Sequence, residues 1–181
     1  MWNEKAAMNA GRWVSKCEAI SSSREERMVD GSVCGEITLQ TNYPTSWNEA
    51  IETFASGQTY FQYSTGSTDP TKNVYGYTQI IWHNSKQVGC ALGFCPKATN
   101  RFLYVCHYCP SGNIDGQLNT PYKSGPPCSD CRGSCEDKLC SSSCQFTDKN
   151  NDCENLIGSF TCTYPFVQER CPASCKCPKD E

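Results

Sequence analysis

The sequence has few histidines and no long apolar run. Among 181 residues only His83 and His107 are histidines, which leaves few nitrogen ligands for a zinc or copper site. No stretch of 18 apolar residues occurs, so the sequence predicts no transmembrane segment. The 16 basic and 19 acidic residues are well mixed and form no basic stripe, so we expect no nucleic-acid partner.

The motifs of common hydrolases are also missing. The sequence contains neither G-x-S-x-G nor H-E-x-x-H. A cysteine nucleophile needs a free thiolate and a partnered histidine, whereas the even count of 16 cysteines allows every thiol to be paired. We interpret His107 as a structural or surface histidine of a strand and His83 as a loop residue. The sequence therefore predicts no enzyme, no catalytic residue and no cofactor.

An export signal and an N-glycosylation sequon are absent as well. Residues 1–5 contain no apolar segment of the kind that a signal peptide requires. Persistent disulfides nevertheless require an oxidising compartment. We therefore expect a secreted, extracellular protein whose N-terminus is incomplete or processed in this sequence.

Cysteine is abundant, at 16 of 181 residues or about 9 per cent, near the level of disulfide scaffolds. Ten of the 16 lie between Cys128 and Cys177. Four follow C-x2-C-x3-C-x4-C from Cys128, and six follow C-x8-C-x8-C-x8-C-x3-C-x-C from Cys144. A segment this short cannot bury a large apolar core, so crosslinks must make it rigid. The spacings fit no usual zinc pattern, which favours disulfides over metal.

Part of a calcium-binding EGF pattern occurs at residues 153–162. An EGF module would place another cysteine two positions after Cys162, where the sequence has Tyr164. The even spacing of the tail cysteines therefore argues against an EGF module.

The first hundred residues predict a mixed α and β domain. Apolar residues at three- and four-residue steps predict a helix over 5–17, and Ser46 with Glu49 three residues later predicts a capped helix over 46–55. Apolar and alternating patterns predict strands over 88–94 and 102–108, with Cys90 and Cys106 placed for a cross-strand disulfide. The other expected segments are loops at 21–32 and 65–72 and a linker at 112–127.

Short motifs run along the whole chain: CGE at 34–36, YTQIIW at 77–82, YVCHYCPSGN at 104–113, GPPC at 125–128 and CPASCKC at 171–177. In this combination the sequence resembles the cysteine-rich secretory proteins (CRISPs) of the CAP superfamily. The resemblance implies an α+β fold with a CAP α-β-α sandwich followed by a small disulfide-rich hinge and a toxin-like, cysteine-rich helical domain. The implied domains are an N-terminally incomplete CAP (SCP-like) domain at 1–110 without the family's first helix, a linker at 111–127, a disulfide hinge at 128–140 and a cysteine-rich, helical, ShKT-like ion channel regulator domain at 144–177.

The resemblance also implies how the cysteines pair, which spacing alone does not give. The eight implied disulfides are Cys17–Cys95, Cys34–Cys109, Cys90–Cys106, Cys128–Cys135, Cys131–Cys140, Cys144–Cys177, Cys153–Cys171 and Cys162–Cys175.

The cavity of the family usually holds two histidines and two glutamates, a set that can bind a divalent cation. Here Gly76 precedes Tyr77 where the family has a histidine, and counting from Trp47 places Gly57 at one of the glutamate positions. Glu36 is retained. One carboxylate is too few ligands for zinc, so we predict no metal site.

For function, the resemblance implies a secreted, non-enzymatic protein that modulates an ion channel or receptor through its cysteine-rich domain. Its partner would be an ion channel or another cell-surface protein. Apolar residues are many for so small a module, so we expect a binding face that includes Phe160, Tyr164, Phe166 and Val167, although each could instead be core. The alternative is a reproductive-tract or defence protein that acts by cell-surface, lipid or sterol binding through the CAP domain.

Overall fold

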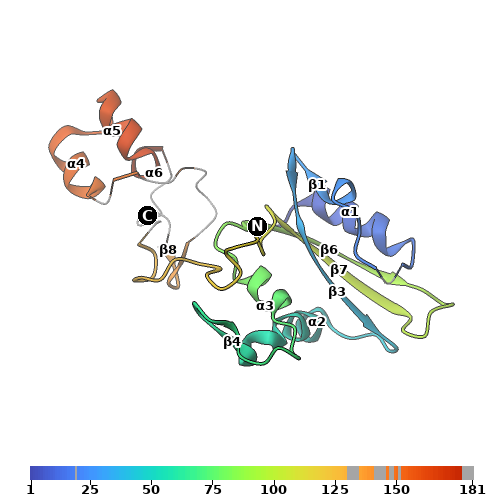
Figure 1. Cartoon of the computed structure of the whole chain (residues 1–181). Coiled ribbons are helices and arrows are strands. Elements are labelled where there is room, and N and C mark those ends of the chain that lie inside the picture. Colours follow the sequence, from blue (N-terminus) through green and yellow to red (C-terminus); the bar gives the residue numbers. More distant parts are fainter. Residues whose placement is uncertain (19, 130–134, 141–145, 147–148, 151, 177–181) are drawn as a thin grey trace. The chain divides into compact units, whose positions relative to one another are not determined.

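The computed structural model describes residues 1–18, 20–129, 135–140, 146, 149–150 and 152–176 (Figure 1). The chain divides into two compact units, Met1–Lys123 and Ser124–Glu181. The helices and strands of the first unit are α1 (Glu4–Val14), η1 (Glu25–Arg27), β1 (Met28–Val29), β2 (Ser32–Val33), β3 (Gly35–Thr41), α2 (Trp47–Phe54), η2 (Ala55–Tyr60), β4 (Phe61–Gln62), β5 (Gly66–Ser67), α3 (Tyr75–Ile80), β6 (Gln87–Phe94) and β7 (Phe102–Cys109). Those of the second unit are β8 (Cys135–Glu136), β9 (Leu139–Cys140), α4 (Cys153–Phe160), α5 (Pro165–Arg170) and α6 (Pro172–Lys176). Within the described ranges, no helix has the length and apolar character needed to cross a membrane.

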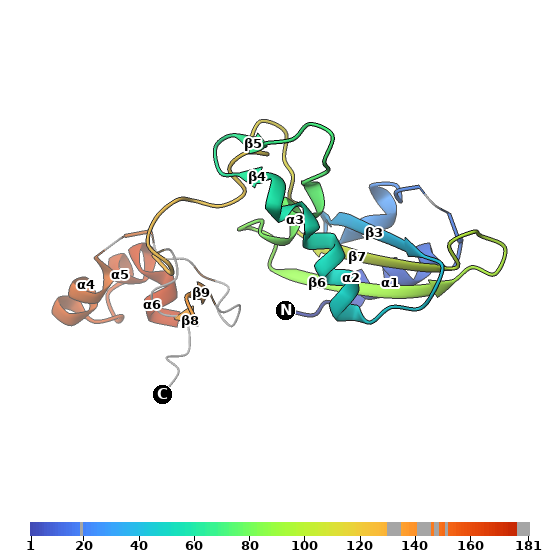
Figure 2. The same ribbon diagram turned by 90° about the horizontal axis from the view of Figure 1, so that it is seen from below.

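A three-stranded antiparallel sheet of order β3-β7-β6 forms the centre of the first unit. Its strands β6 and β7 match the predicted strands closely. The register places Glu36 opposite His107 and Cys90 opposite Cys106. Because side chains alternate between the two faces of a strand, the sheet has two distinct faces. Figures 1 and 2 show α1 on one face and α2 with α3 on the other.

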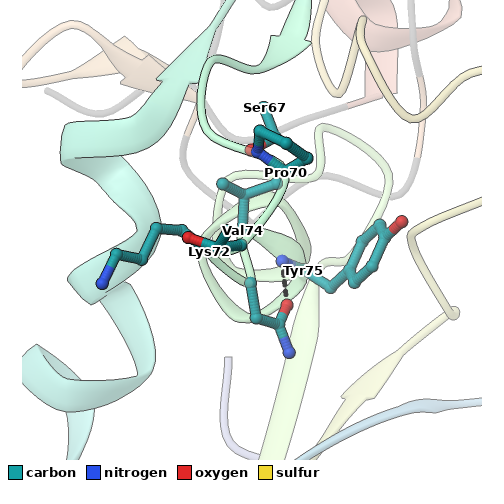
Figure 3. Close-up of a pocket in the computed structure, with 7 residues that line it drawn as sticks. Ser67, Pro70, Lys72, Val74 and Tyr75 are labelled. Atoms are coloured by element: carbon teal, nitrogen blue, oxygen red, sulfur yellow. Dashed lines mark hydrogen bonds between the residues drawn. The ribbon is translucent and has the colours of Figure 1, made fainter.

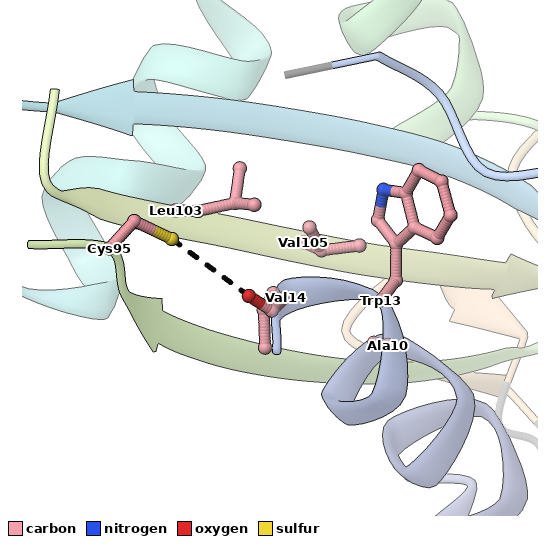
Figure 4. Close-up of a cluster of buried hydrophobic side chains, with 6 residues drawn as sticks. All are labelled: Ala10, Trp13, Val14, Cys95, Leu103 and Val105. Atoms are coloured by element: carbon pink, nitrogen blue, oxygen red, sulfur yellow. Dashed lines mark hydrogen bonds between the residues drawn. The ribbon is translucent and has the colours of Figure 1, made fainter. Parts of the chain in front are cut away.

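Helix α1 covers the first face of the sheet. The side chain of its N-cap residue, Asn3, accepts a hydrogen bond from the backbone N–H of Ala6 over 2.9 Å. The apolar stripe of the helix packs on β7 and on the end of β6 (Figure 4). This cluster consists of Ala10, Trp13, Val14, Cys95, Leu103 and Val105.

The expected helix over 5–17 ends at Val14, earlier than its apolar pattern suggests. The reason is Cys17, whose φ of 57° lies outside the helical region. Its backbone N–H bonds to the carbonyl of Val14, three residues back. The disulfide to Cys95 then joins the end of α1 to the end of β6. The helix therefore ends where the chain turns toward the disulfide, although the apolar periodicity of the sequence continues to Cys17.

Helix α2 covers part of the second face. It has the capping box that the sequence predicts, with Ser46 and Glu49 bonding reciprocally. Its buried residues Ala50 and Phe54 pack against Ile37 of β3 and the buried residues of β7. The C-terminal half of β6 is less covered by helices. Its side chains Leu92 and Phe94 are 45% and 59% exposed, and we call this pair the exposed cluster.

Two expected loops contain short regular elements. Residues 21–32 include η1 and the start of the β1–β2 hairpin. The hairpin turns at Asp30 and Gly31, whose φ values of 47° and 82° fit the two-residue Asp-Gly turn of a tight hairpin. Residues 65–72 include β5, which pairs with β4. Both hairpins have two-residue strands, too short to leave a periodic pattern in the sequence.

The second unit is built from short elements and crosslinks. Strands β8 and β9 form a hairpin that turns at Asp137 and Lys138. Helices α4 to α6 surround a small cluster in which Val167 is fully buried. The architecture as a whole is α+β with a disulfide-rich region of short helices, as the sequence predicts.

Six disulfides are described, and all six are pairs that the resemblance implies. Two further implied pairs, Cys131–Cys140 and Cys144–Cys177, each include a cysteine outside the described residues. No described cysteine is free. The six are Cys17–Cys95, Cys34–Cys109, Cys90–Cys106, Cys128–Cys135, Cys153–Cys171 and Cys162–Cys175.

Candidate functional site

Three exposed aromatic side chains meet on the second unit. Phe160, Tyr164 and Phe166 are 46%, 52% and 40% exposed. Their ring centroids lie 6.3 Å apart for Phe160 and Tyr164, 5.4 Å for Phe160 and Phe166, and 5.9 Å for Tyr164 and Phe166. These separations are typical of edge-to-face aromatic contacts. We call this group of three rings the aromatic surface.

The local backbone explains why the three rings converge. Phe160 is the last residue of α4, and Tyr164 is the N-cap of α5, where Pro165 supplies the fixed φ that suits the first helical position. Between them the chain reverses at Thr161, which has a φ of 48°. The side-chain amide of Gln168 donates to the carbonyl of Cys162 over 2.8 Å, which ties α5 to this turn.

Val167 does not belong to the aromatic surface. It is 0% exposed and packs with Cys153 and Cys171, so its predicted place on a binding face is corrected: it is core. In a helix, consecutive residues point about 100° apart, so Val167 can pack in the cluster while Phe166, next to it in sequence, faces solvent. The sequence alone does not show which side of α5 is buried, so it could not tell the core residue from the exposed one.

Gly57 and Gly76 lie where backbones approach closely. A Cβ atom at Gly76 would lie 2.5 Å from the carbonyl oxygen of Phe54, and a Cβ at Gly57 would lie 2.8 Å from that of Asn73. Such distances are far shorter than a van der Waals contact. The two glycines therefore allow the segment from α2 to η2 to pack directly on α3, and larger side chains would force the two segments apart.

Glu36 lies on the other face of the sheet from these glycines. A Cβ at Gly76 would approach Ile37, the next residue along β3, and neighbouring residues of a strand point to opposite faces. The structure thus brings positions 57 and 76 close to the same packing surface but leaves Glu36 apart. Among the residues that the structure describes, no group of three or more His, Cys, Asp or Glu side chains could hold a metal ion.

Glu36 instead forms a buried polar cluster. One carboxylate oxygen lies 3.0 Å from Nε2 of His107 and accepts from the hydroxyl of Ser22 over 2.5 Å, and the other accepts from the backbone N–H of Ser22 over 2.9 Å. Arg27 lies 3.9 Å from the carboxylate and donates to the carbonyl oxygens of Ser22 and Cys34.

The environment of this cluster keeps Glu36 ionised. Burial raises the pKa of Glu36, but the hydrogen bonds from His107 and Ser22 outweigh it and place the pKa below its ordinary value of 4.5. Nδ1 of His107 is buried and has no hydrogen-bond partner. The sequence indicated a structural strand histidine at this position. It gave no sign of the partners Ser22 and Arg27, which lie 14 and 9 residues before Glu36 in an expected loop.

An open hollow of about 500 Å³ lies on the segment before α3 (Figure 3). It is lined by residues 67 and 70–75, and several of its polar groups are engaged by neighbouring residues. Asn73 accepts from the backbone N–H of Tyr75 over 2.8 Å, and Lys72 lies 5.4 Å from the ring of Tyr60. No unpartnered charged group among the described lining residues faces it, so the aromatic surface is the stronger candidate site.

Comparisons with known proteins agree with the division of the chain into two units. Residues 1–108 match the model of the family described as CAP, cysteine-rich secretory protein family, and residues 128–181 match the model described as Crisp.

Solved structures show the same fold at low sequence identity. Venom allergen-like protein 4 of Schistosoma mansoni is 19% identical with a TM-score of 0.56, and the match covers 70% of this chain and 74% of that one. A structure described as NaASP2 with Zn2+ is 23% identical with a TM-score of 0.60 and coverages of 78% and 75%. BmVAL-1 is 23% identical with a TM-score of 0.55 and coverages of 78% and 71%.

Proposed function

Because this chain belongs to the cysteine-rich secretory proteins of the CAP superfamily, we propose that it is a secreted, non-enzymatic protein that modulates an ion channel or another cell-surface receptor. Contact is made through the second unit. The observation that carries this proposal is the aromatic surface, in which three large rings are exposed side by side. The cysteine content supports an extracellular location, since disulfides persist in oxidising compartments.

The physical case rests on the area and rigidity of the aromatic surface. Aromatic residues are enriched at the centres of protein interfaces, where burying each ring contributes a large apolar area. The rings sit on two helix ends, and the Cys162–Cys175 disulfide crosslinks the segment between them to α6. A preorganised surface loses less conformational entropy on binding.

The charges around the aromatic surface favour contact with an outer face over entry into a pore. Toxins that plug potassium channels generally use a protruding lysine beside an aromatic residue. Between Cys162 and Cys171 the only basic residue is Arg170, and Glu169 precedes it. We therefore propose that the second unit covers the extracellular vestibule of a channel or binds a comparable surface.

The test uses the whole chain and currents from a panel of voltage-gated potassium and calcium channels expressed in oocytes. Wild-type protein is expected to reduce the current of at least one channel. Phe166→Ala and Tyr164→Ala should each weaken that block about 30-fold, the effect of losing an interface hot spot. Phe94→Ala is the matched control, because Phe94 is also an exposed, ring-paired phenylalanine but belongs to the first unit. Block that is absent throughout the panel, or equal for wild type and Phe166→Ala, contradicts the proposal.

A second candidate function is favoured by the exposed cluster at Leu92 and Phe94. These side chains continue the apolar face of the sheet beyond the cover of α2, and exposed apolar patches often mark a contact surface. The corresponding function is binding to cell-surface lipid or sterol through the first unit. Co-sedimentation with phosphatidylcholine–cholesterol vesicles tests it: Phe94→Ala should reduce binding and Phe166→Ala should not, the reverse of their effects on channel block.

A further inference from the structure

The Cys128–Cys135 disulfide differs from the other described disulfides in its surroundings. Cys135 is exposed and Cys128 is partly exposed. Among the described residues, neither cysteine belongs to an apolar cluster, whereas each of the other five described disulfides has at least one cysteine within or packed against one. Among the described crosslinks it is thus the one without an apolar cover.

The described strands around this disulfide are short and exposed. Strands β8 and β9 have two residues each and contact chiefly one another. Glu136, Leu139 and Cys140 are exposed, and Leu139 is 73% exposed. Local opening of such a segment exposes few apolar contacts and therefore costs little free energy. The exposure of Cys135 therefore offers a reductant a point of attack on the folded protein.

We propose that Cys128–Cys135 is a redox modification site, the substrate of a dithiol reductant such as a thiol–disulfide oxidoreductase. The thiolate of the dithiol attacks Sγ of the exposed Cys135, the S–S bond breaks, and Cys128 leaves as a thiolate that takes up a proton. The second thiol of the reductant then attacks the mixed disulfide and releases Cys135. In sum, one dithiol is oxidised to a disulfide, and one protein disulfide gains two electrons and two protons.

Reduction at this site opens the chain locally. The two cysteines are only 7 residues apart in sequence, compared with 75 for Cys34–Cys109. A short crosslink restricts the unfolded chain less than a long one, so its loss destabilises the protein less. Both units retain their apolar clusters and the disulfides within them. The inference is independent of the proposed function, because it rests on exposure and packing alone.

The experiment follows the order in which disulfides are reduced in the native, full-length protein. Dithiothreitol is added in limiting amount near pH 7, free thiols are trapped with iodoacetamide, and each cysteine is quantified by peptide mass spectrometry. Cys128 and Cys135 should be alkylated at least about tenfold faster than Cys153 and Cys171, since exposed disulfides react before covered ones. The near-ultraviolet circular dichroism should stay unchanged during this first phase.

A double variant provides the control. Cys128→Ser with Cys135→Ser should keep the wild-type melting temperature within a few degrees and should lack the fastest phase of reduction. Cys162→Ser with Cys175→Ser, a pair that packs against the tail cluster, should retain that phase. If Cys128 and Cys135 react no faster than the covered pairs, or if the first double variant still shows the fastest phase, the inference is wrong.

Discussion

Nε2 of His107 lies 3.0 Å from the carboxylate of Glu36, and the two side chains are 0% and 2% exposed. The pair spans β3 and β7 and holds the segment with Ser22 and Arg27 against the sheet. The resemblance to the family suggested Glu36 as one possible cation ligand. Here its oxygen atoms are occupied by hydrogen bonds from the protein itself, so the residue anchors a loop.

Replacing Glu36 by glutamine should destabilise the first unit by about 2 kcal/mol, because hydrogen bonds to a charged group contribute about 1.5–3 kcal/mol. The free energy of unfolding, measured by urea titration at pH 7, checks this. Glu52→Gln is the control: Glu52 is exposed on α2, and its substitution should leave the unfolding free energy within about 0.5 kcal/mol of wild type.

Wild-type protein and Glu36→Gln also provide a test of pH dependence. The pKa of Glu36 is lowered from 4.5 in the folded protein, so its stabilisation is fully present above the unfolded pKa and is lost as the pH falls through the folded pKa. The difference in melting temperature between wild type and Glu36→Gln should therefore shrink below about pH 4.5. A difference that stays constant down to pH 2.5 would show that the charge of Glu36 is unimportant.

Alanine at Gly76 should destabilise the protein by about 1–3 kcal/mol, because its Cβ would lie 2.5 Å from the carbonyl oxygen of Phe54. Gly158→Ala is the matched control in α4, where an added Cβ meets no atom within 4 Å. That change should instead stabilise the helix by about 0.5–1 kcal/mol. Thermal unfolding of both variants measures the contrast, and equal effects would mean that the close approach at Gly76 is not a constraint.

Titration with zinc should detect no specific site on the wild-type protein. The described residues offer no cluster of three metal-ligating side chains, and glycines stand at positions 57 and 76. Isothermal calorimetry near pH 7 should show only weak surface binding. A one-to-one site with submicromolar affinity would refute this expectation and would require a rearrangement of the η2–α3 packing.

Val167→Ala and Phe166→Ala should separate core from surface in the second unit. Val167 is 0% exposed, so its truncation should cost about 1–2 kcal/mol through the cavity it leaves. Phe166 is 40% exposed, and Phe166→Ala should keep the melting curve and the disulfide pairs near wild type. Peptide mapping of the disulfides and thermal unfolding check both. Unfolding or scrambled pairing in Phe166→Ala would assign Phe166 to the core.

Local patterns in the sequence were sufficient for α1, α2, β6 and β7, whereas β3 of the central sheet and helix α3 were not predicted. The capping box of Ser46 and Glu49 started α2 as predicted, because a cap depends on residues within one helical turn. Alternation likewise identified β7, and the motifs of the CAP and Crisp families confirmed the fold class. At Cys17, which forms a disulfide with the distant Cys95, the local pattern failed: it predicted a helix that extends beyond the observed end at Val14.

The sequence by itself determined the fold class, through its resemblance to a known family, and the crosslinked character of the tail, through the number and spacing of its cysteines. It also fixed the glycines at positions 57 and 76. Only the tertiary structure decided that Val167 is buried while Phe166 is exposed, and that Glu36 bonds to His107 and Ser22. The reason is physical. Burial and hydrogen-bond partners depend on how each helix is rotated against its neighbours and on how strands pair across long separations in sequence. The periodicity of one segment carries no information about the position of another.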